Sequence, residues 1–151
     1  MKPLILLIVV SGLTLLGMKL FQGTYDLPRA ARIGMSAMLL FTALGHFMFA
    51  DGMAMMIPDF FKFKKELVYF TGVIEIAAAI GLHVVAFRQL TGWLLIVFFI
   101  LILPANIKAA IDQVDYQKAT FNGPGLKYLW FRVPLQLFFI GWVYLSAIWN
   151  R

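Results

Sequence analysis

Five polar side chains stand out in this sequence because each lies within a long apolar stretch. They are His46, Glu75, Asn106, Arg132 and Gln136. An imidazole, a carboxyl, a guanidinium and two amides have two main uses inside an apolar bundle. They can pair with one another and lock the helices together, or they can form the polar end of a cavity for a small ligand. Which use applies depends on the elements that hold these side chains in place.

Glu75 lies near the middle of residues 67–87, an apolar stretch long enough to cross a bilayer as a helix. About 20 apolar residues cover the roughly 30 Å hydrocarbon core. A carboxyl at that depth costs about 2.5–3.5 kcal/mol, so it normally faces the bundle interior and a partner. Helical periodicity places mostly small side chains on the same face, which lets other helices approach: Thr71, Gly72, Ala78, Ala79 and Leu82. Glu75 is therefore predicted to point inward.

The other four polar residues lie on three further predicted helices. His46 belongs to the helix predicted over residues 33–50, and Asn106 to one over about 91–110 that Pro104 should bend. Arg132 and Gln136 share a face of the last helix, over about 128–149. Residues 51–65 are too mixed to cross a membrane and are predicted to be interfacial or re-entrant. Arg88 and Gln89 form so short a connection that the helices beside them should be antiparallel neighbours.

Residues 1–20 form another apolar segment, which has the shape of a signal peptide. No small-x-small cleavage site follows it, so we interpret it as a retained first helix. The predicted organisation is an N-terminal transmembrane helix and first loop over residues 1–28, followed by a four-helix membrane domain over residues 29–151. If the first helix lies on the membrane surface, four spanning helices remain.

The composition identifies the class of protein. The chain has 151 residues, of which 62% are hydrophobic and 13% charged, with a mean hydropathy of +0.88. A soluble domain would have about 25% charged residues, so we expect an all-α integral membrane bundle. The net charge of +6 comes from lysines and arginines at the ends of apolar segments, where they meet lipid headgroups rather than nucleic acid. Their distribution predicts a cytoplasmic N-terminus, and we expect the membrane itself to be a bacterial inner membrane.

No metal, cofactor or catalytic residue is predicted. The chain has two histidines and no cysteine, and no His-x-x-His or Glu-x-x-His spacing suggests a metal centre. P-loop, dinucleotide-binding and serine-nucleophile motifs are missing from the sequence, so nothing here identifies an enzyme.

Glu75 and Arg132 are predicted to form an ion pair. Each is an inward charge in an apolar helix without an opposite charge four residues away, and an unpaired buried charge costs several kcal/mol. In the alternative, the polar residues surround a ligand instead of neutralising one another.

Short motifs around these residues resemble the DoxX family of small membrane proteins. The matching stretches cover about residues 29–144: Gly45-His46-Phe47, Met56-Ile57-Pro58, Thr71-Gly72-Val73-Ile74-Glu75-Ile76, Gly81-Leu82, Leu103-Pro104-Ala105-Asn106-Ile107 and Phe131-Arg132-Val133-Pro134-Leu135-Gln136. The resemblance implies a four-helix core, to which this chain adds an N-terminal helix. Relatives are linked to a thiosulfate:quinone oxidoreductase, to thiol or oxidative-stress complexes, and in animals to the assembly of ion-channel receptors. The family provides no agreed catalytic residue.

These observations predict a non-catalytic accessory or binding subunit of a quinone-linked membrane redox complex. Its partners would be membrane lipids, a quinone or other lipid-soluble ligand between the helices, and other membrane-protein subunits. Two alternatives remain open: an assembly factor that holds another membrane protein, and a small proton-coupled transporter, since intramembrane Glu and His can relay protons.

Overall fold

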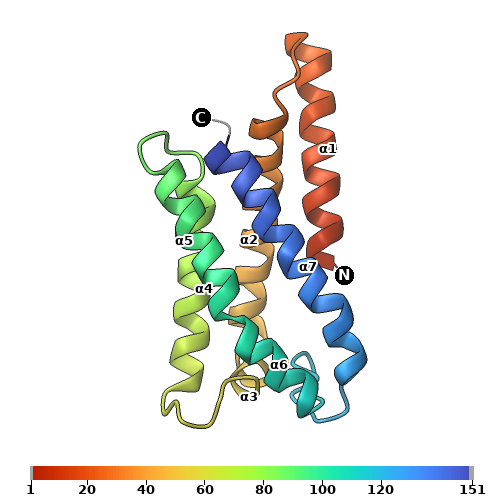
Figure 1. Cartoon of the computed structure of the whole chain (residues 1–151), viewed down its shortest axis with the longest axis vertical. Helices are drawn as coiled ribbons and strands as arrows, with labels where there is room; N and C mark the ends of the chain where they lie inside the picture. The colour runs from red at the N-terminus through yellow and green to blue at the C-terminus, as the bar shows by residue number, and fades with distance from the viewer. Residues whose placement is uncertain (1, 150–151) are drawn as a thin grey trace.

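A computed structural model describes residues 2–149, and these residues form an all-α bundle without β-strands (Figure 1). The elements in chain order are α1 (Lys2–Gln22), α2 (Leu27–Met48), α3 (Ala50–Met55), α4 (Lys64–Gly81), α5 (Arg88–Leu101), α6 (Leu103–Ile111), α7 (Leu126–Val143) and the π-helix η1 (Tyr144–Trp149). The predicted all-α fold class is confirmed for the described residues. Met1, Asn150 and Arg151, which the sequence-based predictions included, lie outside them.

Four helical stretches are long and apolar enough to cross a membrane. They are α1, α2, the pair α5–α6 (Arg88–Ile111), and α7 with η1 (Leu126–Trp149). The helix that carries Glu75 differs, because α4 has three further charged residues in its first turn, Lys64, Lys65 and Glu66. Four candidate spans therefore support the conclusion that this is a membrane protein. The fifth span, predicted over residues 67–87, stays a prediction.

The end of α4 differs from the prediction. The helix stops at Gly81, and residues 82–87 form successive turns in which His83 N–H donates to the Ile80 carbonyl and Phe87 N–H to the Val84 carbonyl. Arg88 is the first residue of α5 rather than part of the connection. Glycine has a low helix propensity, and the ring of His83 turns toward α2 at this point, where it contacts Ser36. The predicted two-residue connection was wrong, although α4 and α5 are antiparallel (Figure 1).

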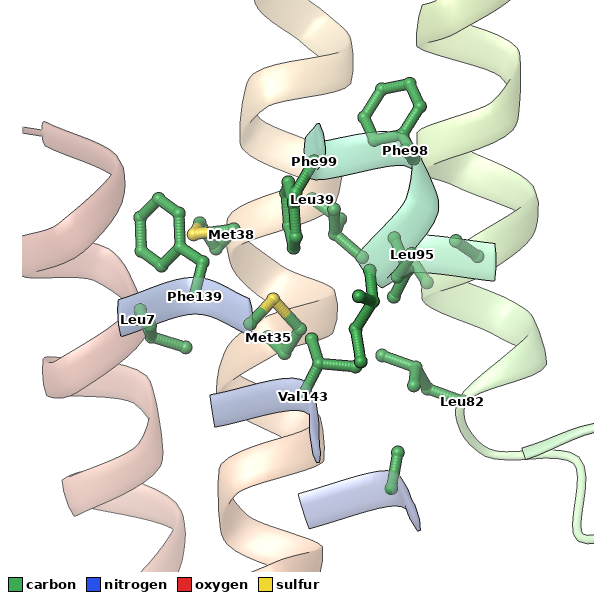
Figure 2. Close-up of a cluster of buried hydrophobic side chains, with 14 of the residues drawn as sticks. Leu7, Met35, Met38, Leu39, Leu82, Leu95, Phe98, Phe99, Phe139 and Val143 are labelled. Carbon is green, nitrogen blue, oxygen red and sulfur yellow. The ribbon is translucent and has the colours of Figure 1, made fainter. Parts of the chain in front are cut away.

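The long helix α2 occupies the centre of the bundle, between α1 and α4 (Figure 1). It begins where the Asp26 side chain accepts a hydrogen bond from the backbone N–H of Arg29, and Pro28 stands in its first turn. Its Met35, Met38 and Leu39 are fully buried. Figure 2 shows these three side chains surrounded by core residues of the other helices: Leu7, Leu82, Leu95, Phe98, Phe99, Phe139 and Val143.

The first helix packs along α2 at one close point. A side chain at Gly34 of α2 would collide with the Ser11 hydroxyl and the Leu7 carbonyl of α1. Only glycine therefore allows this approach, which buries Leu7 completely. The other faces of α1 expose apolar side chains such as Ile5, Leu13 and Leu16, as expected of a helix that contacts lipid.

The helix predicted over about 91–110 is broken in two. A turn at Ile102 separates α5 from α6, and Pro104 lies in the first turn of α6. Proline has no N–H to donate to the carbonyl four residues earlier, so the helix cannot continue straight through this position. The predicted bend is confirmed.

Candidate functional site

Gly72 brings α4 close to α2 at the level of His46. A Cβ atom added at Gly72 would lie 3.0 Å from the Cβ of His46 and 3.3 Å from the ring of Phe47. The close approach lets the imidazole of His46 cross from α2 to the surface of α4. Gly72 thus allows side chains of α2 to contact α4 directly. We call the contact between these two helices the α2–α4 seam.

His46 contacts three groups of α4. Its Nδ1 lies 3.0 Å from the Val68 carbonyl oxygen and 2.8 Å from the Thr71 hydroxyl, and its Nε2 lies 3.5 Å from Oε2 of Glu75. A carbonyl oxygen can only accept, so Nδ1 carries a hydrogen and donates it. In the neutral ring, Nε2 then presents a lone pair to the carboxyl of Glu75.

The contact between His46 and Glu75 therefore requires a proton. Nε2 of a neutral ring and Oε2 of an ionised carboxyl are both acceptors, and two acceptors at 3.5 Å repel each other. Either His46 or Glu75 must carry one more proton, or a bound molecule must donate to both. The pair can consequently hold and release a proton at one defined position between α2 and α4.

Glu75 is buried, as predicted, but its hydrogen bonding is incomplete. The residue is 5% exposed, and its Oε2 accepts no hydrogen bond from any residue that the structure describes. The Thr42 hydroxyl lies within hydrogen-bonding reach of the carboxyl, but it has a single hydrogen, for which the carbonyls of Met38 and Leu39 compete with the carboxyl. A buried acceptor without a donor costs about 1–3 kcal/mol, so this oxygen is the natural place for an added donor.

The predicted ion pair between Glu75 and Arg132 is not formed. Arg132 instead donates to the Tyr128 hydroxyl at 3.1 Å, and its guanidinium lies 5.8 Å from the centre of the Tyr128 ring. Arg132 acts on Glu75 only at longer range. The reason is the difference in depth: Arg132 lies less than two turns from the start of α7, where Tyr128 one turn earlier provides a nearer partner.

Asn106 and Gln136 form a second polar centre with a different environment. The Asn106 amide donates to Oε1 of Gln136 at 3.2 Å, and Nε2 of Gln136 donates to the Phe99 carbonyl. Phe99 lies one turn before the break at Ile102, where the backbone hydrogen bonding of the helix is interrupted. Gln136 of α7 therefore holds the broken helix in place, and Asn106 holds Gln136.

The five predicted residues thus separate into three groups: His46 with Glu75, Asn106 with Gln136, and Arg132 with Tyr128. Sequence reasoning missed the contacts of Arg32, Ser36 and His83 at the other end of the α2–α4 seam. Arg32 and Ser36 lie four residues apart and therefore on one face of α2, a spacing that could have revealed them. Among residues 2–149 no three His, Cys, Asp or Glu side chains lie close enough to hold a metal ion.

An open hollow of about 480 Å³ lies beside α6, and none of the five predicted residues lines it. Its lining consists of Asp59, Pro104, Ile107, Lys108, Ile111 and Asp112. Lys108 there pairs with Asp112 at 2.5 Å, and Asp59 pairs with Lys64 at 2.6 Å. The charges around this hollow are already neutralised by one another.

The fold and these centres define a class: a small helical-bundle protein of membrane type with buried polar contacts between its helices. The chain belongs to the family of the domain of unknown function DUF8561, which it matches over residues 35–147. No curated protein matches it. No solved structure matches it either. The matched region includes all five predicted polar residues and begins within α2.

Proposed function

We propose that this protein is a non-catalytic membrane subunit that binds a lipid-soluble ligand with a carbonyl or hydroxyl head, a quinone being the leading candidate. The observation that carries the proposal is the buried contact between His46 and Glu75, whose two facing acceptor atoms need one shared proton or the hydrogen of a bound donor. A quinol hydroxyl could supply that donor, and a quinone carbonyl could accept from the protonated pair. The resemblance to the DoxX family supports a role in a redox complex of the bacterial inner membrane.

Access to the pair favours a ligand that arrives from the bilayer. The side chain of His46 is 17% exposed, whereas that of Glu75 is 6% exposed. Apolar side chains flank His46 on the outer surface of α2, among them Leu44 and Phe47. A ring could therefore approach His46 from the lipid and present its oxygen to the buried carboxyl.

Proton-coupled transport is the second candidate, and the same contact favours it. A histidine and a carboxyl that share one proton inside a helical bundle are suited to proton relay. The two functions differ in what they need: a binding subunit retains a ligand, and a transporter moves protons across a sealed membrane.

The test uses the full chain purified from its native membranes and compares three variants. We expect mass spectrometry of the organic extract to find a quinone with the wild-type protein, and to find much less with Glu75→Gln and His46→Gln. Glu66→Gln is the matched control, because Glu66 is an exposed carboxylate on the same helix. The control should retain the ligand fully.

Two outcomes would contradict the binding proposal. Equal amounts of quinone with Glu75→Gln and Glu66→Gln would place any bound quinone elsewhere. A protein without extractable ligand that dissipates a pH gradient in liposomes, and loses this activity in Glu75→Gln, would establish the transport alternative.

A further inference from the structure

Helices α2 and α5 both begin at the end of the bundle that is opposite to α3 (Figure 1), and four basic residues lie in or next to their first turns. Arg29 and Arg32 lie in the first two turns of α2, Arg88 opens α5, and His83 lies in the connection that precedes α5. We call these four residues the arginine cluster. Arg32 and His83 lie within electrostatic reach of Arg29 and Arg88.

Arg32 and His83 are held in fixed positions. Arg32 is 7% exposed, and its Nη1 donates to the Ser146 carbonyl of the π-helix at 2.7 Å. The Ser36 hydroxyl donates to the Ala79 carbonyl and also lies 2.9 Å from Nε2 of His83. Because the hydrogen of the serine is directed to Ala79, Nε2 of His83 is the donor in this contact. Helices α2, α4 and η1 therefore all contribute to the position of the cluster.

The cluster lacks matching negative charge among the described residues. Asp26 is the acid that acts on Arg32, and its carboxylate already accepts from the backbone of Arg29. The first turns of α2 and α5 contain no acid, so the positive ends of both helix dipoles add to the charge of the arginines. Burial and the fields of Arg32, Arg88 and Arg29 lower the pKa of His83.

Arg88 provides a direct sign of a missing acceptor. Its Nε is buried and has no hydrogen-bond partner among residues 2–149. A buried guanidinium nitrogen without an acceptor is costly, and arginine matches the oxygens of phosphate particularly well. An anion with several oxygens would provide both an acceptor for this donor and a negative charge to offset the positive charge around it.

We propose that the arginine cluster binds a phosphate group, of the kind carried by an acidic phospholipid headgroup. The cluster lies at the ends of apolar helices, where headgroup phosphates stand in a bilayer. The phosphate supplies the acceptor for Arg88 and offsets the charges of Arg29 and Arg32. This inference does not depend on the quinone proposal, because it concerns the other end of the α2–α4 seam.

The experiment measures lipid binding to the full chain in detergent by native mass spectrometry. Phosphatidylglycerol and phosphatidylcholine are compared for the wild type and for Arg88→Gln, Arg29→Gln and Lys19→Gln. Lys19 is the matched control, a cation at the same end whose ammonium lies 5.0 Å from the centre of the Tyr25 ring. We expect phosphatidylglycerol to bind preferentially, and each arginine variant to lose about fivefold in affinity, the usual effect of one basic residue near an anionic lipid. Lys19→Gln should stay close to wild type.

A parallel arm separates a lipid from a free anion. Inorganic phosphate is added to the delipidated protein while thermal unfolding is followed. Stabilisation by phosphate that is lost in Arg88→Gln would support the site and assign it to a soluble phosphate. Equal binding of both lipids without an effect of phosphate, or equal losses in Arg88→Gln and Lys19→Gln, would overturn the proposal.

Discussion

The two polar centres of this bundle differ in how completely their side chains are hydrogen-bonded. At Asn106 and Gln136, donors and acceptors match, from one amide to the next and on to the Phe99 carbonyl. At His46 and Glu75, the histidine is bonded through Nδ1, but Oε2 of the carboxyl accepts no hydrogen bond. Glu75, Asn106 and Gln136 are all buried, so the missing hydrogen bond of Glu75 does not come from exposure of the carboxyl to solvent.

This difference indicates which centre is structural. A satisfied polar network rigidifies the elements that it joins, and an unsatisfied buried acceptor weakens the fold unless something else binds to it. Asn106 and Gln136 hold the broken helix α5–α6 against α7. His46 and Glu75 leave an opening for a proton or a ligand at the seam between α2 and α4.

The largest expected effect comes from removing the close approach that creates the incomplete centre. Gly72→Val should push α4 away from His46 and Phe47 and cost about 3 kcal/mol, because overpacking a tight contact usually costs 1–3 kcal/mol. Gly141→Val is the matched control, since a Cβ at Gly141 meets nothing within 4 Å. Thermal unfolding in detergent would measure both. A Gly72→Val protein as stable as the control would show that α2 and α4 separate easily here.

A smaller effect distinguishes the two centres directly. Gln136→Leu should cost about 1–3 kcal/mol, because it leaves the Asn106 amide and the Phe99 carbonyl without partners. Glu75→Gln should change stability by less than about 1 kcal/mol, since it replaces a buried carboxyl whose Oε2 has no donor among the described residues with an amide of similar shape. Denaturant or thermal unfolding of the ligand-free protein would compare them. If Glu75→Gln costs as much as Gln136→Leu, both centres are structural and the distinction fails.

Much of the arrangement around Glu75 follows from helical periodicity. The small residues on its face, Gly72 and Ala78 among them, predict both its burial and a close neighbouring helix, and the structure agrees. Position along the helix axes is harder to predict, because the sequence does not give the relative shift of two helices. Arg132 was therefore assigned to Glu75, although its depth in α7 brings it to Tyr128.

Sequence patterns do not predict hydrogen bonds between a side chain and a backbone group. Gln136 is placed by the Phe99 carbonyl, Arg32 by the Ser146 carbonyl, and His46 by the Val68 carbonyl. The sequence shows that such a side chain is polar. It does not show which backbone carbonyl accepts the hydrogen bond, because every residue has a carbonyl. The break at Ile102 could be predicted from Pro104, whereas the early end of α4 depends on the contact between His83 and Ser36.

The smallest expected effect concerns His83. Its side chain, which contacts Ser36, is exposed to solvent, unlike those of the two polar centres compared above. His46 extends from α2 to α4 at one end of the seam, and His83 returns from the end of α4 to Ser36 of α2 at the other. Burial, then Arg32, Arg88 and Arg29, lower the pKa of His83 below the ordinary value for histidine of about 6.5. Below about that pH the unfolded chain binds a proton that the folded chain does not, so this residue makes stability fall as the pH decreases.

His83→Gln should therefore flatten the decline in melting temperature between about pH 7.5 and pH 5.5. The change should be modest, because His83 is exposed and solvent screens the arginines. Phosphate bound to the arginine cluster would oppose the lowered pKa, so adding phosphatidylglycerol should flatten the wild-type profile in the same direction. A steeper profile for His83→Gln would mean that protonation of His83 stabilises the fold, and the local field would then be negative rather than positive.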